Sequence, residues 1–139
     1  MGFDEICIFC KIAQKQAPAS IIYEDQFTMA FLDIRPLTMG HTLVISKDHY
    51  TNIFDIPKEA LCQMHITAKH VAKAVKTATN ADGISIFQQN GRAAGQDIFH
   101  IHVHVVPRFE GQGLSSFSSL ELVDRDMLDN IAKKVVLHL

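Results

Sequence analysis

The chain has 139 residues, 47% of them hydrophobic, which predicts a single domain over residues 1–139 with one hydrophobic core. Its formal net charge of −2 at pH 7 argues against a nucleic-acid-binding surface, and no apolar run is long enough to span a membrane. The three cysteines, with no export signal before them, favour reduced thiols and a cytoplasmic location.

The N-terminal half of the chain predicts a short helix followed by three strands. The helix is expected over residues 7–15 and should end before Pro18. Segments rich in β-branched and aromatic residues predict the strands at 21–25, 27–33 and 41–46. Pro36 and Gly40 mark residues 34–41 as a loop.

The longest predicted helix covers residues 57–79, with Asp55 as its cap and Pro57 in its first turn. Apolar residues recur along it every three or four positions: Leu61, Met64, Ala68, Val71, Val75 and Ala78. After it, in order, the sequence predicts a strand at 84–89, a loop at 90–97, a strand at 99–106, a loose segment at 111–119 and a C-terminal helix at 125–138.

The connections between most of these strands are too short for parallel crossovers. We therefore expect an α+β fold with a mostly antiparallel five-stranded sheet, one long helix packed on it, a short N-terminal helix and a C-terminal helix.

Three histidines alternate with branched apolar residues in "HIHVHVV", residues 100–106. On a strand, His100, His102 and His104 share one face, while the residues between them face the core. Successive histidines are then about 6.7 Å apart at Cα, and the outer two about 13 Å, so one metal ion would not easily bind all three. Pro107 should end this strand or place it at the edge of the sheet.

Three segments of the sequence resemble the histidine triad (HIT) family of nucleotide hydrolases and transferases. They are "CIFCKI" at 7–12, "YEDQFTMAFLDIRPLTMGHTLVISKDH" at 23–49 and "NGRAAGQDIFHIHVHVVPR" at 90–108, which contains the "HIHVHVV" of residues 100–106. The resemblance covers a core of about residues 6–110, is nearest to the Hint-like or bacterial branch, and leaves residues 111–139 as an extension. It implies the HIT fold and a homodimer.

The resemblance also implies a reaction. His102 would attack the α-phosphorus of a purine nucleotide and form a covalent nucleotidyl-histidine, which water then cleaves. A backbone carbonyl near His100 would hold one ring nitrogen of His102. His104 would donate a hydrogen bond to a phosphate oxygen or to the leaving group.

Other residues match nucleotide-binding positions of the family. Asp33 would accept hydrogen bonds from the ribose hydroxyls, and Ile34, with Phe31 and Leu43, would line the base pocket. The expected phosphate contacts are Gln89 and the turn at Gly95, Gln96 and Asp97. Relatives usually carry Ser or Thr at position 97. Asp97 therefore either turns away from the phosphate or, with a raised pKa, donates a proton to it.

The Cys-x-x-Cys pair at Cys7 and Cys10 has the spacing of a zinc site. In zinc-containing relatives two such cysteines join histidines that correspond to His49 and His100. The resemblance thus implies a structural zinc ion with four protein ligands, and no catalytic metal. His41 is expected near the triad, where it would orient a ring.

Several functions stay open at this stage. The favoured substrates are nucleoside phosphoramidates, and the alternative within the family is a dinucleoside polyphosphate of the Ap3A or Ap4A type. Outside this chemistry, the chain would be a metalloprotein that uses the His-x-His pattern directly, or a nucleotide-binding scaffold without significant turnover.

Overall fold

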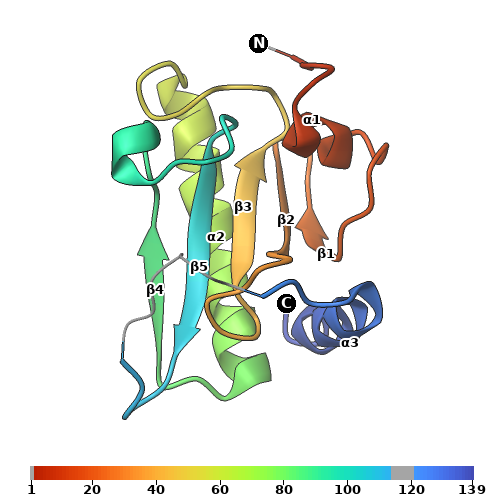
Figure 1. Ribbon diagram of the computed structural model, residues 1–139, viewed down its shortest axis with the longest axis vertical. Coiled ribbons are helices and arrows are strands. Elements are labelled where there is room, and N and C mark those ends of the chain that lie inside the picture. The colour runs from red at the N-terminus through yellow and green to blue at the C-terminus, as the bar shows by residue number, and fades with distance from the viewer. Residues whose placement is uncertain (1, 114–120) are drawn as a thin grey trace.

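The computed structural model describes residues 2–113 and 121–139 and consists of one antiparallel sheet with helices around it (Figure 1). The strands are β1 (Ile21–Glu24), β2 (Thr28–Leu32), β3 (Thr42–Ser46), β4 (Gly83–Phe87) and β5 (His102–Arg108), in the order β1-β2-β3-β5-β4. The helices are α1 (Ile8–Ala13), the 22-residue α2 (Lys58–Thr79), α3 (Arg125–Val136) and a 3₁₀ turn, η1 (Arg92–Ala94). The predicted α+β class and five-stranded antiparallel sheet are confirmed.

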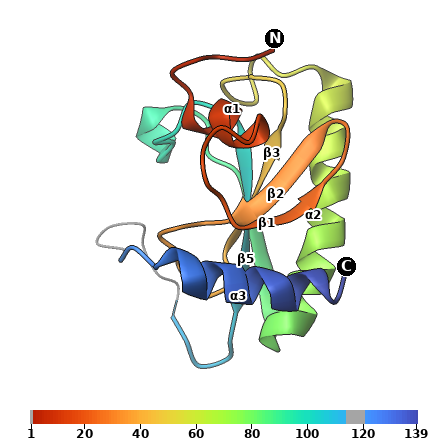
Figure 2. The ribbon, with the colours of Figure 1, turned by 90° about the vertical axis from the view of Figure 1, so that its right-hand side faces the viewer.

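Side-chain alternation divides the interior between the two faces of the sheet. Helix α2 covers one face, as Figure 2 shows. Its buried face packs on the inward side chains of the central strands, which include Val44, Val103 and Val105. Short α1 lies on the other face, where Phe9 and Ile12 cluster with Phe31, Leu43 and Ile45.

The same alternation decides where the histidines point. Leu43 pairs with His104 and Ile45 with His102 across β3 and β5. Residues paired across an antiparallel ladder lie on the same face. His102 and His104 therefore lie on the α1 side, with Phe31 and Leu43.

The last strand differs from its prediction at both ends. It begins at His102 rather than residue 99, because the preceding Ile101 N–H donates to Tyr50 O (2.8 Å) in the loop beyond β3. It continues through Pro107, which pairs with Ile84 of β4. The expected strand end is right to within one residue, because β5 ends at Arg108. The expected sheet edge is wrong, because β5 lies between β3 and β4; Pro107 needs no N–H toward β3, which has already ended at the Thr42–Val105 pair.

Two smaller expectations also change. Asp55 does not cap α2: the cap position is Pro57, and the Asp55 carboxylate instead accepts from the N–H groups of Thr51 and Asn52, both at 3.0 Å. It closes the turn before the helix. The loose segment predicted at 111–119 lies largely outside the described residues. No helix in the described ranges combines the length and hydropathy of a membrane span.

Candidate functional site

A pocket of about 630 Å³ opens on the α1 side of the sheet. Its walls come from α1, the end of β2, the loop that contains η1, and β5. Among the predicted nucleotide-binding residues, those that line it are Asp33, Ile34, Gln89, Gly95, Asp97, His102 and His104. The geometry thus brings together residues that are up to 71 positions apart (33 to 104).

The ring of His102 is held by one strong hydrogen bond. Its Nδ1 lies 2.7 Å from the backbone oxygen of His100. A carbonyl oxygen only accepts, so Nδ1 carries the proton and Nε2 keeps its lone pair. Burial lowers the pKa of His102, against opposing effects of the His100 carbonyl and Asp97. The ring is therefore neutral at physiological pH, with Nε2 available as a nucleophile.

A chain of hydrogen bonds likewise fixes the proton on His104. The N–H of Leu37 donates to His41 Nδ1 (3.0 Å), so the neutral His41 ring carries its proton on Nε2. That nitrogen lies 2.9 Å from His104 Nδ1, which must accept. His104 then carries its own proton on Nε2 and acts as a hydrogen-bond donor.

Burial keeps both of these rings neutral. It lowers the pKa of His41 and of His104 to about 3 in each case, and the positive charge of Arg108 acts in the same direction on His41. Conversely, burial raises the pKa of Asp33 to about 6, with a further contribution from the negative charge of Asp97. Asp33 Oδ2 lies 3.6 Å from His41 Nε2, which joins the carboxylate to the histidine chain.

We expect His41 to make the protein less stable in acid. Its pKa in the folded state (about 3) is below the unfolded value of about 6.5, so the unfolded state takes up the proton first. The stability that the neutral His41 ring contributes to the folded state is complete above pH 6.5 and is lost as the pH falls toward 3. Between pH 7 and pH 5 the loss is about 2 kcal/mol. In His41→Gln, the fall in the free energy of unfolding over this range should be smaller by about that amount, as measured by urea denaturation.

The exposed His65 of α2 provides the control for this measurement. His65→Gln should lose as much stability between pH 7 and pH 5 as the wild type. If His41→Gln also does so, burial of a neutral His41 does not contribute to the pH dependence.

The turn after η1 contributes to the pocket differently from what the sequence suggested. Gly95 has φ +96°, and a Cβ on it would lie 2.6 Å from Gln89 Nε2, so glycine lets these two segments touch. The N–H groups of Gly95 and Gln96 donate inside the turn, to Arg92 O (3.0 Å) and Gly91 O (3.1 Å). The Gln96 side chain is buried and bonds to Thr51 O instead of lining the pocket. Asp97 is exposed and lines it.

The sequence did not predict all of the lining. Ile8, Phe9 and Ile12 come from α1, and their spacing within "CIFCKI" is the signal that would have indicated a shared face. Arg125, at the start of α3, also lines the pocket, and no local pattern in the sequence marks it.

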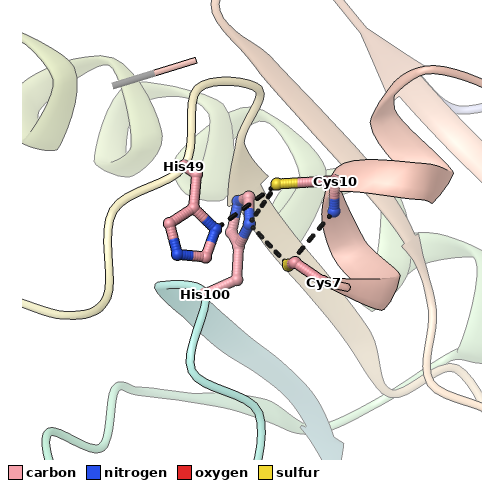
Figure 3. Close-up of side chains that lie close together, drawn as sticks. All are labelled: Cys7, Cys10, His49 and His100. Carbon is pink, nitrogen blue, oxygen red and sulfur yellow. Dashed lines mark hydrogen bonds between the residues drawn. The ribbon is translucent and has the colours of Figure 1, made fainter. Parts of the chain in front are cut away.

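A second cluster lies at the His100 side chain and consists of Cys7, Cys10, His49 and His100 (Figure 3). His100 Nδ1 lies 3.3 Å from Cys7 Sγ and 3.5 Å from Cys10 Sγ, while His49 Nδ1 lies 3.3 Å from Cys10 Sγ. The Nε2–H group of His100 donates to Ser46 O at 2.7 Å. Nδ1 of the neutral ring therefore carries no proton, and its lone pair is directed at the two sulfur atoms.

This donor set fits a tetrahedral metal ion. Two thiols and two imidazole nitrogens are the ligands that Zn²⁺ prefers in closed structural sites. Burial raises the pKa of Cys10 to about 11, so a metal ion must displace a proton there. Among residues 2–113 and 121–139, the other metal-capable cluster is Asp33, His41 and His104, and neither cluster includes His102.

The sequence and the fold are similar to those of known proteins. The HIT domain family model matches residues 14–111. The adenosine 5'-monophosphoramidase of Saccharomyces cerevisiae is 37% identical over 137 residues, which cover 98% of this chain and 84% of that protein.

Two solved structures are also similar over nearly the whole chain. A Hit-like protein from Bartonella henselae, described as involved in cell-cycle regulation, has a TM-score of 0.90 and 37% identity and covers 99% of this chain and 100% of its own. A Zn-bound histidine triad family protein from Mycobacterium smegmatis has a TM-score of 0.85 and 40% identity, with coverages of 96% and 92%.

Proposed function

The chain belongs to the HIT domain family, and from this premise we propose that it is a hydrolase that cleaves purine nucleotides at the α-phosphate, with nucleoside phosphoramidates as substrates. The observation that carries the proposal is the 2.7 Å bond from His102 Nδ1 to the His100 carbonyl, which leaves a neutral Nε2 as nucleophile. The similarity to a yeast adenosine 5'-monophosphoramidase supports the choice of substrate.

The proposed reaction has two steps. His102 Nε2 attacks the α-phosphorus, a P–N bond to His102 forms, and the bond from phosphorus to the amine breaks. Water then cleaves the nucleotidyl-histidine and regenerates the neutral ring. In both steps we assign His104 Nε2–H to a phosphate oxygen, where charge accumulates. Asp33 would bind the ribose hydroxyls, Ile34 the base, and Gln89, which lines the pocket beside Gly95, the phosphate.

The departing amine must gain a proton, and we propose Asp97 as its donor. The Asp97 carboxyl group lines the pocket with His102. If Asp97 is the acid, Asp97→Ser changes the pH profile of kcat for an amine leaving group. Superimposable pH profiles of kcat for the two proteins would contradict this role.

One residue, Arg35, favours dinucleoside polyphosphates as a second substrate class. Arg35 is exposed at the pocket, and its positive charge acts on Asp33. A cation there suits the additional phosphates of a dinucleoside polyphosphate.

The test compares release of AMP from adenosine phosphoramidate and from diadenosine tri- and tetraphosphate, with and without chelator. We expect the phosphoramidate to be preferred and chelator to have no immediate effect. A preference for the polyphosphates that is lost in Arg35→Gln would favour the second class. If AMP binds but no substrate is cleaved, the protein is a nucleotide-binding scaffold, and if chelator stops turnover at once, it is a metalloenzyme.

We further propose a cytoplasmic homodimer with structural zinc, built from one domain over residues 1–139. The zinc proposal rests on the cluster of Cys7, Cys10, His49 and His100. The cytoplasmic location is supported by the three cysteines, which form no disulfide with one another.

Dimerisation is supported by β4, an edge strand whose Ile86 is 47% exposed. Sedimentation of the wild type and of Ile86→Lys would test the dimer.

A further inference from the structure

The segment that leads into α3 is attached directly to the wall of the pocket. The N–H of Val123 donates to Ile34 O at 2.9 Å, so the C-terminal part of the chain lies beside the end of β2 (Figure 1). Two residues further on, Arg125 Nη1 donates to Ser20 Oγ at 2.8 Å, and Ser20 Oγ donates to Asp129 Oδ1 at 2.6 Å. These bonds hold the guanidinium of Arg125 at the pocket, which it lines.

Arg125 lies at the end of the pocket away from the reacting histidines. Its hydrogen-bond partner Ser20 follows Pro18 and Ala19, which also line the pocket, and Val123 ties the same segment to Ile34. His102 and His104 lie on β5, which β2 and β3 separate from β1 and from Ser20 just before it, and Asp33 follows β2. If phosphate binds at His102 and ribose at Asp33, as the proposed function requires, the base lies toward Ile34 and Arg125.

The walls and the rim of this end suit different parts of a purine. The side chains of Phe31 and Ile34, with those of Pro18 and Ala19, are apolar and offer contact to the flat faces of a base. The hydrogen-bonding edge of the base would then meet the guanidinium of Arg125, which Ser20 holds at this end. In the described part of the chain Arg125 forms no direct ion pair, and its link to the Asp129 carboxylate runs through Ser20 Oγ.

A guanidinium can only donate hydrogen bonds. Guanine presents two acceptors side by side, O6 and N7, and an arginine fork fits both. Adenine presents N7 beside an amino group, which is a donor and faces the guanidinium unfavourably. A residue that only donates therefore distinguishes the two purines.

We propose that Arg125 contacts the O6/N7 edge of the bound base and makes the site prefer 6-oxopurine nucleotides over adenine nucleotides. This inference rests on the proposed function, since it uses the same pocket in the same orientation. It gives the C-terminal segment a role in base selection.

The test is calorimetric binding of GMP, IMP, AMP and 7-deaza-GMP, which needs no turnover. In the wild type we expect GMP and IMP to bind about tenfold more tightly than AMP, because both carry O6 and N7. The 7-deaza analogue, which lacks N7, should bind more weakly than GMP. In Arg125→Gln the affinities for GMP and AMP should become equal through weaker GMP binding, with AMP affinity little changed.

Two further variants separate recognition from charge and from folding. Arg125→Lys keeps the charge but loses the fork, so it should lose the preference. Arg35→Gln removes the other guanidinium of the pocket and should keep it. Equal affinities in the wild type, a preference that survives Arg125→Gln, or an equal loss for GMP and AMP in that variant overturns the proposal. If no nucleotide binds to the wild type, the proposed function fails as well.

Discussion

His102→Ala is expected to lower the rate of AMP release by at least about 1000-fold, because a covalent route loses its nucleophile. The affinity for AMP should change far less, since Asp33 and the apolar end of the pocket are untouched. Wild-type protein quenched in alkali, where the P–N bond of a nucleotidyl-histidine survives, should carry one nucleotidyl group on His102, detectable by peptide mass spectrometry, and the variant should carry none. Steady-state AMP release and AMP binding are measured side by side.

The control for this variant is His41→Gln, which keeps the nucleophile but interrupts the hydrogen-bond chain to His104. It should still form the nucleotidyl-histidine, at a reduced rate, because only the orientation of His104 is affected. Residual turnover in His102→Ala close to that of the wild type would exclude nucleophilic catalysis by this histidine. A labelled residue other than His102 would likewise contradict the assignment.

Much of this arrangement follows from period-two alternation along one strand. Ile101, Val103 and Val105 are buried in the α2-side core, while His102 and His104 reach the pocket, as the pattern of residues 100–106 predicted. Local pattern sufficed here because a one-residue shift would move His102 and His104 into the α2-side core, so the apolar face fixes the register.

The features that the sequence did not predict depend on contacts between distant segments. Asp55 is of a residue type that often caps helices, but its carboxylate accepts hydrogen bonds from the turn before α2. The start of β5 depends on Tyr50, 51 positions before Ile101, which takes the backbone bond that would have extended the ladder. Arg125 reaches the pocket only because Ser20 and Ile34 hold its segment there. No periodicity in a single segment carries such information.

We expect Cys10→Ser to lower the zinc content by about one ion per chain and Tm by about 10 °C. The two cysteines and two histidines join α1 to the loop after β3 and to His100, two residues before β5. Loss of one thiolate therefore weakens a link between three segments that α1 alone, at 6 residues, holds poorly. Zinc content is measured by atomic absorption, and Tm by calorimetry.

The exposed Cys62 of α2 gives the matched control, because Cys62→Ser removes a thiol that lies outside the cluster. It should keep the zinc content and Tm of the wild type. AMP release by Cys10→Ser, measured well below its Tm, should fall by less than about tenfold, since the cluster touches His102 only through the backbone oxygen of His100. A Cys10→Ser protein with wild-type zinc content and Tm would show that these four residues do not hold a metal ion. A complete loss of AMP release in the folded variant would instead give the cluster a direct part in the chemistry.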